Sequence, residues 1–373
     1  MTKLHGSTIG WLSAVSGYRP ATWNLTSGCI PMSAGCDNCC ARSIHRRFHP
    51  GQPFEQVRLH PERLDRFSRW RAPRMVFVGS MSDLFHPDVP EVYIGSVFRA
   101  MAQAPQHLYV ILTKRPDRAA GILTAWGQTR SWTCRDGAQW TQPAWPLPNL
   151  WLGTSVEHQL AADERIPHLL RAPAARRIVS AEPMLGPVDL DPWLWVDPWL
   201  WDGWTCPSCG TRHLNTISDT CVQCGTRTWP LRYRSLDWVI AGGETGPRAR
   251  PAKPAWFASL RDQCGNAGVP FFFKSLGEWA QAPWKLQREP SESSDDYRAR
   301  SDAQCATHAF TGGYYRQDGM DVEGFMALGH RPSSSERDET TPQGATGMRR
   351  ASKKTTGRLL DGRTWDEAPE VDQ

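Results

Sequence analysis

Four cysteines lie close together near the start of the chain, in the segment GCIPMSAGCDNCCA. Six residues separate Cys29 from Cys36, two separate Cys36 from Cys39, and Cys40 follows directly. Clustered thiols can form disulfides, bind zinc, hold an iron–sulfur cluster or supply a nucleophile. The rest of the sequence has to distinguish these four chemistries.

The chain carries no sequence signal for a membrane or for secretion. No stretch approaches the run of about 20 apolar residues that a membrane helix needs, and the first residues lack a basic region followed by an apolar one. We therefore expect a cytoplasmic protein with no membrane partner. Because the cytosol is reducing, clustered thiols there are more often metal ligands or catalytic groups than disulfides.

The three-Cys loop, residues 29–39, carries Cys29, Cys36 and Cys39. A structural zinc would need a fourth ligand, which Cys40, His45 or His49 would have to supply. Three thiolates on one loop instead suit a cubane iron–sulfur cluster with one iron left open. Both kinds of metal site remain possible from the residues alone.

A second cysteine cluster has a more specific spacing. TCPSCG at 205–210 and TCVQCG at 220–225 form two CxxC knuckles with eleven residues between them. Such paired knuckles predict a structural zinc ribbon, with a rubredoxin-like iron site as the alternative. The expected ligands are Cys206, Cys209, Cys221 and Cys224, in an inserted module at 191–234.

The elements that would position these groups alternate between apolar runs and helical patterns. Strands are predicted at 22–25, 75–79, 108–112, 150–153, 177–179, 238–241 and 269–273, and helices at 89–104, 161–170 and 254–267. This alternation predicts an α/β fold, a full or partial (β/α) barrel of the TIM type over 1–289. A long loop is expected at 125–148, and a mostly flexible, polar C-terminal region at 290–373 with a docking motif near 357–369.

Polar residues follow six of the predicted strands. In a β/α barrel the C-terminal ends of the strands converge on the catalytic mouth, so these residues are candidates for one polar site that also includes the three-Cys loop. A single such residue can instead be a helix cap, and Asp83 or His86 can be either an acid/base group or a helix-start contact. The candidates are Asp83, Lys114, Arg115, Glu157, Glu182, Glu244 and Lys274.

The three-Cys loop after the first strand, ending in CxxC, resembles the radical SAM superfamily. The resemblance implies that Cys29, Cys36 and Cys39 hold a [4Fe-4S] cluster whose open iron binds S-adenosylmethionine. One-electron reduction would then give a 5′-deoxyadenosyl radical. The superfamily usually has three residues between the first two cysteines, whereas this chain has six. Gly242, Gly243 and Glu244 are similar to the motif that binds the cofactor's amino group, but follow a later strand.

A second resemblance covers most of residues 20–280. Motifs such as SAGCDNC, FVGSMSDLFHPDVP, ILTKRP, SAEPMLGP and DWVIAGGETGPRARP, with GRLLDGRTWDE near the end, are similar to a family of phage and prophage proteins that carry a three-Cys motif and have unknown function. In that family an aromatic residue commonly follows the third cysteine, where this chain has Cys40. The zinc ribbon resembles a variable insertion between two barrel strands.

These resemblances imply a radical SAM-like enzyme that needs an electron donor. Carboxylates at the strand ends would bind the amino group and ribose of the cofactor, and Lys114, Arg115 and Lys274 its carboxylate or a substrate phosphate. The net charge of +5, the stretch MRRASKKTTGR and the 19 Trp residues allow a nucleic acid or nucleotide as substrate, for base modification or repair.

Two rival functions remain open from the sequence. One is a zinc-stabilised barrel that binds nucleic acid or an unknown protein partner without turnover. The other is a barrel hydrolase or nuclease that uses the acidic strand ends, although no compact metal motif such as HExxH accompanies them.

Overall fold

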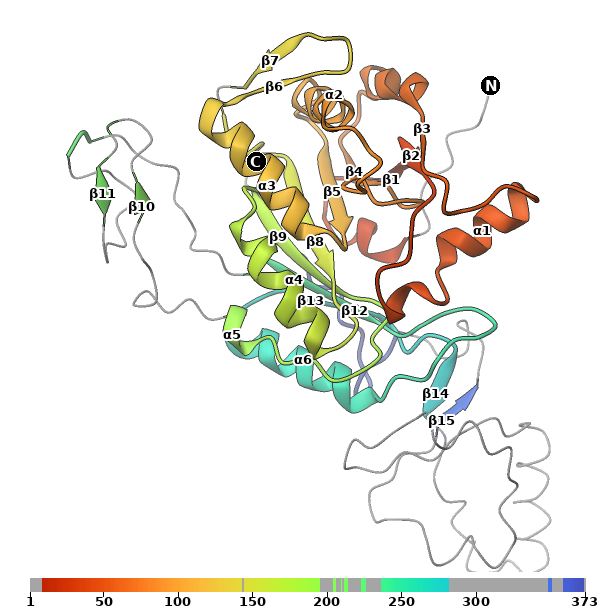
Figure 1. Cartoon of the computed structure of the whole chain (residues 1–373). Coiled ribbons are helices and arrows are strands. Elements are labelled where there is room, and N and C mark those ends of the chain that lie inside the picture. Colours follow the sequence, from red (N-terminus) through yellow and green to blue (C-terminus); the bar gives the residue numbers. More distant parts are fainter. Residues whose placement is uncertain are drawn as a thin grey trace, which may run out of the picture.

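The main body is a curled sheet of seven parallel strands, a half-barrel (Figure 1). The structure, a computed structural model, describes residues 9–142, 144–194, 204–205, 209, 211–213, 223–225, 236–281, 348–350 and 358–371. In sheet order the strands are β1 (Arg19–Trp23), β4 (Arg74–Val78), β5 (Leu108–Thr113), β8 (Leu150–Ser155), β9 (Arg176–Ala181), β12 (Trp238–Gly242) and β13 (Phe271–Ser275). Within the described residues no pairing joins β13 back to β1. The predicted α/β class is confirmed, and the barrel is the partial one.

Helices cover the outer face of this sheet (Figure 1). They are α2 (Glu91–Ala102), α3 (Pro116–Thr129), α4 (Gln159–Arg171) and α6 (Pro254–Ala267), each placed between two consecutive strands of the sheet. Outward strand residues such as Val76 and Leu152 share one core cluster with helix residues such as Phe98. Because both faces of the strands are buried, their sequences read as continuous apolar runs.

The inner, concave face is filled at its N-terminal end by a separate apolar cluster. The short helix η1 (Gly10–Ser13) places Trp11 and Leu12 against inward residues of the strands, including Trp151 and Trp238. The ring centroids of Trp11 and Trp238 are 6.0 Å apart in an edge-to-face arrangement. This plug closes the bottom of the half-barrel, so polar groups on the concave side gather at the C-terminal ends of the strands.

The chain between β1 and β4 leaves the sheet before returning to it. It contains β2 (Thr26–Ser27) and β3 (Arg58–Leu59), which pair antiparallel, with η2 (Ala34–Cys36) and α1 (Cys40–Phe48) between them and η3 (Pro61–Arg69) after them. Helix α1 stands to one side of the sheet, away from the row of outer helices (Figure 1). Only Ala41 and His45 of α1 are buried.

The expected loop at 125–148 is wrong. Its first residues complete α3, and a hairpin of β6 (Ser131–Thr133) and β7 (Gln139–Thr141) follows. Trp132 stacks on Trp126, with ring centroids 5.2 Å apart, and its indole nitrogen donates to Gly95 O of α2 at 2.8 Å. The hairpin is therefore packed through its tryptophans, in strands too short for a period to be visible in the sequence.

Near the C-terminus, residues 358–371 lie along the outer edge of β13. Phe273 N donates to Trp365 O at 2.8 Å, and Glu367 N donates to Phe271 O at 3.3 Å. Leu360 of this segment is only 3% exposed and belongs to the outer core cluster. The segment thus covers the edge that the open half-barrel leaves on β13.

Large parts of the predicted zinc-ribbon module at 191–234 and of the predicted flexible region at 290–373 lie outside the described residues. Of the expected zinc ligands, Cys206 and Cys221 fall there, while Cys209 and Cys224 are described and exposed. Three short pieces flank these regions: α5 (Asp191–Leu194), the pair β10 (Trp204–Thr205) with β11 (Arg212–His213), and the pair β14 (Trp279–Gln281) with β15 (Met348–Arg350). Among the helices that the structure describes, none is long and apolar enough to cross a membrane.

Candidate functional site

The three-Cys loop starts at a position that only glycine suits. Gly28 has φ +88° and forms a bridge to Ser82, beyond the C-terminal end of β4. A Cβ atom added there would lie 2.8 Å from Phe54 O, so any side chain would push the loop away from its neighbours. Cys29 N then donates to the same Phe54 O at 2.9 Å. The local backbone thereby fixes where the first cysteine enters the mouth.

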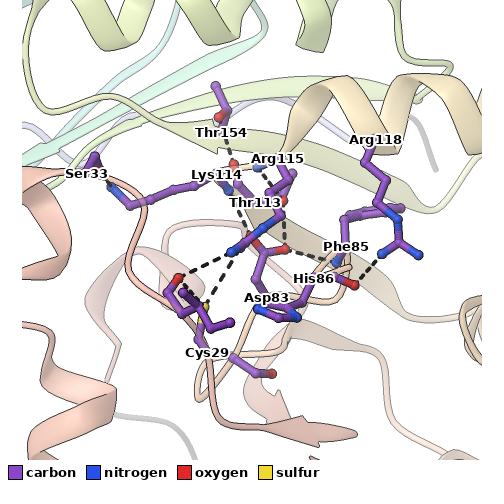
Figure 2. Close-up of polar contacts among 12 residues, drawn as sticks. Cys29, Ser33, Asp83, Phe85, His86, Thr113, Lys114, Arg115, Arg118 and Thr154 are labelled. Atoms are coloured by element: carbon purple, nitrogen blue, oxygen red, sulfur yellow. Dashed lines mark hydrogen bonds and ion pairs between the residues drawn. The ribbon is translucent and has the colours of Figure 1, made fainter. Parts of the chain in front are cut away.

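Asp83, which follows β4, joins the strand ends to the first cysteine (Figure 2). Its Oδ1 accepts from Thr113 Oγ1 at 2.7 Å and from Phe85 N at 2.9 Å, and its Oδ2 accepts from Lys114 N at 3.1 Å and from Arg115 Nη1 at 2.9 Å. Both carboxylate oxygens of this buried residue are therefore engaged. Asp83 acts as a positioning residue for Arg115.

Arg115 links Asp83 to the three-Cys loop. Its Nη1 also lies 3.9 Å from Cys29 Sγ, and its Nη2 donates to Ile30 O at 3.2 Å. A guanidinium beside a sulfur stabilises the thiolate form, whereas burial and Asp83 favour the thiol. Burial is the strongest of these influences, and the pKa of Cys29 is raised.

Glu157, which follows β8, lies at the centre of a buried charge cluster. The residue is fully buried, and its Oε2 accepts from Lys114 Nζ at 3.0 Å and from Arg165 Nη1 at 2.9 Å. Burial alone would raise the carboxyl pKa, but Lys114, Ser33 and Arg165 together lower it to about 2. Lys114 Nζ also donates to Ser33 Oγ in the three-Cys loop at 3.3 Å. The charge cluster is therefore hydrogen-bonded to the loop as well.

Glu244, which follows β12, holds the second half of the same loop. Its Oε2 accepts from Asn38 Nδ2 at 3.0 Å, and its Oε1 accepts from Arg250 Nη2 at 2.6 Å. The same guanidinium donates to Ala34 O at 2.8 Å and to Asp37 Oδ2 at 3.1 Å. Hydrogen bonding to Glu244 raises the pKa of Arg250, which stays charged.

Glu182, which follows β9, pairs with Lys274 of β13 across Gly242. Lys274 Nζ lies 2.6 Å from Glu182 Oε1, and the two side chains are 31% and 14% exposed. A Cβ at Gly242 would lie 2.8 Å from that oxygen, so the glycine leaves room for the ion pair. Burial works against the charge on Lys274, but Glu182 outweighs it and raises the lysine pKa. This pair is more open to solvent than the Lys114–Glu157 pair.

Gly243 also has a structural reason for being glycine. Its N donates to Ser275 O at 2.9 Å, and an added Cβ would lie 3.0 Å from Gly277 N. The two glycines that the sequence assigns to cofactor binding therefore allow close packing between β12 and β13.

The seven predicted polar residues, together with Arg250, form four ion pairs around the three-Cys loop. Four acids follow four different strands, and each pairs with a base: Asp83 with Arg115, Glu157 with Lys114, Glu182 with Lys274, and Glu244 with Arg250. We call these eight residues the ion-pair ring. Three of the four pairs also contact the three-Cys loop, through Ile30, Ser33 and Ala34.

Sequence reasoning missed Asn38, Arg165 and Arg250. Asn38 lies inside the three-Cys loop, Arg165 on α4, and Arg250 six residues beyond Glu244. Arg165 lies on α4, whereas Glu157 precedes that helix, so no helical spacing in the sequence links the two residues. Neither of the other two residues immediately follows a strand, so the search at strand ends could not reach them.

The three thiols of the loop are partly exposed, and Cys40 is exposed. Burial is the main reason why the pKa of Cys39 is raised, and the charge of Cys36 adds to the rise at both Cys29 and Cys39. Across the ranges that the structure describes, no group of three or more His, Cys, Asp and Glu side chains is placed to hold a metal ion.

His86 is a buried histidine next to this arrangement (Figure 2). It is 1% exposed, its Nδ1 accepts from Asp88 N at 3.1 Å, and its Nε2 has no hydrogen-bond partner among the described residues. Burial lowers the pKa of the ring, with Arg115 adding to the effect, so the imidazole is neutral at physiological pH.

Comparison with known proteins assigns the chain to a family. No curated protein and no solved structure matches this chain. A family model described as "Protein of unknown function (DUF5131)" matches residues 8–369, which include the three-Cys loop and the whole ion-pair ring. Since this match spans nearly the full length, the chain belongs to the DUF5131 family.

Proposed function

We propose that the chain is a radical SAM-like iron–sulfur enzyme of phage or prophage origin. In this proposal Cys29, Cys36 and Cys39 hold a [4Fe-4S] cluster, with S-adenosylmethionine bound beside it. One observation carries the proposal: three partly exposed thiols lie on one loop that the strand ends grip at the mouth of a half-barrel. Such a mouth is where β/α barrels place their reactive groups.

The donor set fits this group in its chemistry. Three thiolates from one loop are typical ligands of an iron–sulfur cluster. Among the described residues these thiols are not yet grouped to hold a metal ion, so cluster binding would have to draw the three side chains together. The guanidinium of Arg115 beside Cys29 Sγ would offset part of the negative charge of a thiolate-bound cluster. The raised pKa values of Cys29 and Cys39 mean that metal binding would have to displace protons.

The protein's own residues would bind, orient and exclude water. The Asp83–Arg115 and Glu157–Lys114 pairs are buried and hold the loop, whereas the Glu182–Lys274 pair is partly open and remains a candidate for contacts with cofactor or substrate. A bound cluster and S-adenosylmethionine would supply one-electron reductive chemistry that no side chain offers. A protein electron donor is therefore part of the proposal.

We propose a nucleic acid or a nucleotide as the substrate, with base modification or repair as the reaction class. The basic net charge supports a polyanionic partner, and the cations of the ion-pair ring suit phosphate groups. Zinc in the ribbon formed by Cys206, Cys209, Cys221 and Cys224 would be structural, because paired CxxC knuckles close a tetrahedral site.

Metal analysis and spectroscopy test this proposal. The full chain, purified without oxygen and reconstituted with iron and sulfide, should bind about four irons per chain. Its reduced-cluster electron paramagnetic resonance signal should change when S-adenosylmethionine is added. Replacing Cys36 with Ala should abolish iron binding.

Cys40 provides the matched control. It is the immediate neighbour of Cys39 and exposed, and it is not an expected ligand, so Cys40→Ala should keep its iron. Equal iron content in Cys36→Ala and in the unaltered chain would refute the assignment of the ligands.

A specific observation also favours a second function, a zinc-stabilised barrel that binds nucleic acid or protein without turnover. Each acid of the ion-pair ring is already paired with a base, which is what a structural role for the ring requires. Zinc in both cysteine clusters, with no iron after reconstitution, would establish this function instead.

A further inference from the structure

Helix α1 presents an exposed apolar stripe directly after the three-Cys loop. Ile44 is 45% exposed and Phe48 is 66% exposed, and Cys40 at the start of the helix is exposed as well. These residues are spaced four apart, so they lie on one face of the helix, one above the other. Neighbouring large apolar side chains left open to solvent are typical of an interaction surface.

The stripe is not required to hold the helix in place. The adjoining face of α1 provides Ala41 and the buried His45. The His45 ring packs edge-on against Phe54 with centroids 5.4 Å apart, and its Nε2 lies 3.2 Å from Gln52 O. Residues Ile44 and Phe48 can therefore be changed without removing the contacts that fix α1.

Positive charge surrounds the stripe. Arg46 and Arg47 are exposed, and the Arg47 guanidinium lies 5.6 Å from the centre of the Phe48 ring. Residues 40–59 hold four arginines against the single acid Glu55, a formal net charge of +3. Glu55 is itself paired with Arg42 at 3.5 Å. The charge of this surface is complementary to a polyanion rather than to an average protein surface.

The stripe begins at the candidate site. Cys40, its first residue, directly follows Cys39, the last cysteine of the three-Cys loop. The three-Cys loop adds two more exposed apolar side chains, Ile30 at 45% and Met32 at 46%. A polymer lying on α1 would therefore run toward the ion-pair ring.

We propose that α1 is the contact surface for a single-stranded nucleic acid. A base stacks on Phe48, and the guanidinium groups of Arg46 and Arg47 contact the phosphates on either side. A single strand is favoured over a duplex because an exposed ring can stack only on unpaired bases. This inference rests on the proposed function for its choice of a nucleic acid, and deepens it by naming the form of the substrate and its binding surface.

Fluorescence anisotropy with the full chain and a labelled single strand of about 12 nucleotides tests this inference. Phe48→Ala should weaken binding about 5- to 150-fold, the range expected for the loss of one stacked base. The double variant Arg46→Ala/Arg47→Ala should weaken binding and make the slope of log K against log salt shallower by about 1.4, since each phosphate contact on a single strand contributes about 0.7.

The matched control removes two exposed arginines at the opposite end of the sheet. Arg19 begins β1 and Arg171 ends α4, so Arg19→Ala/Arg171→Ala loses the same charge away from the mouth. The control should bind like the unaltered chain. Equal weakening in both double variants, unaltered binding in Phe48→Ala, or tighter binding of duplex than of single strand would each overturn the inference.

Iron content and the S-adenosylmethionine spectrum of the same preparations separate this inference from the proposed function. An intact cluster together with unaltered binding in the α1 variants would overturn the inference alone. If no cluster forms but binding still depends on α1, the inference is supported and the proposed radical SAM-like function is refuted.

Discussion

At the scale of single residues, the site is dominated by buried charges that are paired. Glu157 is fully buried and Asp83 is 6% exposed, so each needs its cation in place to be tolerated as a charge. Pairs of this kind add little net stability. Removing one partner, however, leaves the other as an unpaired buried charge, which is strongly destabilising. The ion-pair ring therefore acts mainly to fix the position of the three-Cys loop.

The protonation of Glu157 gives a pH-dependent prediction. Its pKa of about 2, against the ordinary 4.5, means that the unfolded chain binds this proton more readily, so stability falls as the pH drops from about 5 to 2. The shift corresponds to about 3 kcal/mol of unfolding free energy. Glu157→Gln should thus be clearly destabilised at pH 7, and its deficit relative to the unaltered chain should shrink toward pH 2 in urea unfolding.

Glu164 supplies the control for this experiment. It is an exposed acid on the same helix as Arg165, so Glu164→Gln should follow the unaltered chain at every pH. A deficit of Glu157→Gln that stays constant with pH would show that the carboxylate is not the group responsible.

At the scale of elements, the three-Cys loop depends on backbone geometry at its entry. Gly28 has both a left-handed conformation and backbone oxygens close to the place where a side chain would start. The same loop is then held by side chains that follow three strands far apart in the sequence, β5, β8 and β12. Apart from the single turn of η2 (Ala34–Cys36), its shape is therefore imposed by contacts from outside the loop.

A second prediction uses two glycines to distinguish the cost of a left-handed backbone conformation from the cost of a steric clash. Gly17 has φ +82° and open space around it, whereas Gly28 has φ +88° and crowded surroundings. Gly17→Ala should cost about 1–2 kcal/mol for the left-handed conformation, and Gly28→Ala at least about 3 kcal/mol because the clash adds to it. Urea unfolding measures both, and equal losses would contradict the crowding at Gly28.

At the scale of the whole molecule, an open half-barrel has to protect its edge. Residues 358–371 pair along β13, and Trp238 Nε1 of β12 donates to Glu367 O at 2.8 Å. The C-terminal segment is thus part of the folded core rather than an appendage.

Adjacent leucines test this contribution. Leu360 is 3% exposed and Leu359 is 57% exposed. Leu360→Ala should lower the unfolding free energy by about 2–5 kcal/mol, whereas Leu359→Ala should stay within about 0.5 kcal/mol. Thermal and urea unfolding of the two variants measure the difference. Similar values for both would show that the segment does not stabilise the sheet.

The sequence by itself determined the α/β class and the approximate places of the seven sheet strands, although the strand predicted at 22–25 shares only residues 22–23 with β1 (Arg19–Trp23). Apolar runs buried on both faces are a local signal, and predicted strands such as 238–241 fall on observed ones such as β12 (Trp238–Gly242). The polar residues after the strands were also visible, because a parallel sheet brings such positions to one edge. Their roles as ligands of a cofactor or substrate remain predictions.

Only the tertiary structure decided how these residues are used. The pairing of Glu182 with Lys274 and of Glu244 with Asn38 joins groups separated by 92 and 206 positions, and no periodic pattern encodes such contacts. The same holds for the half-barrel, whose open edge on β13 is covered by residues near the end of the chain. Local pattern fixes which segments are strands, whereas pairing partners depend on the packing of the entire core.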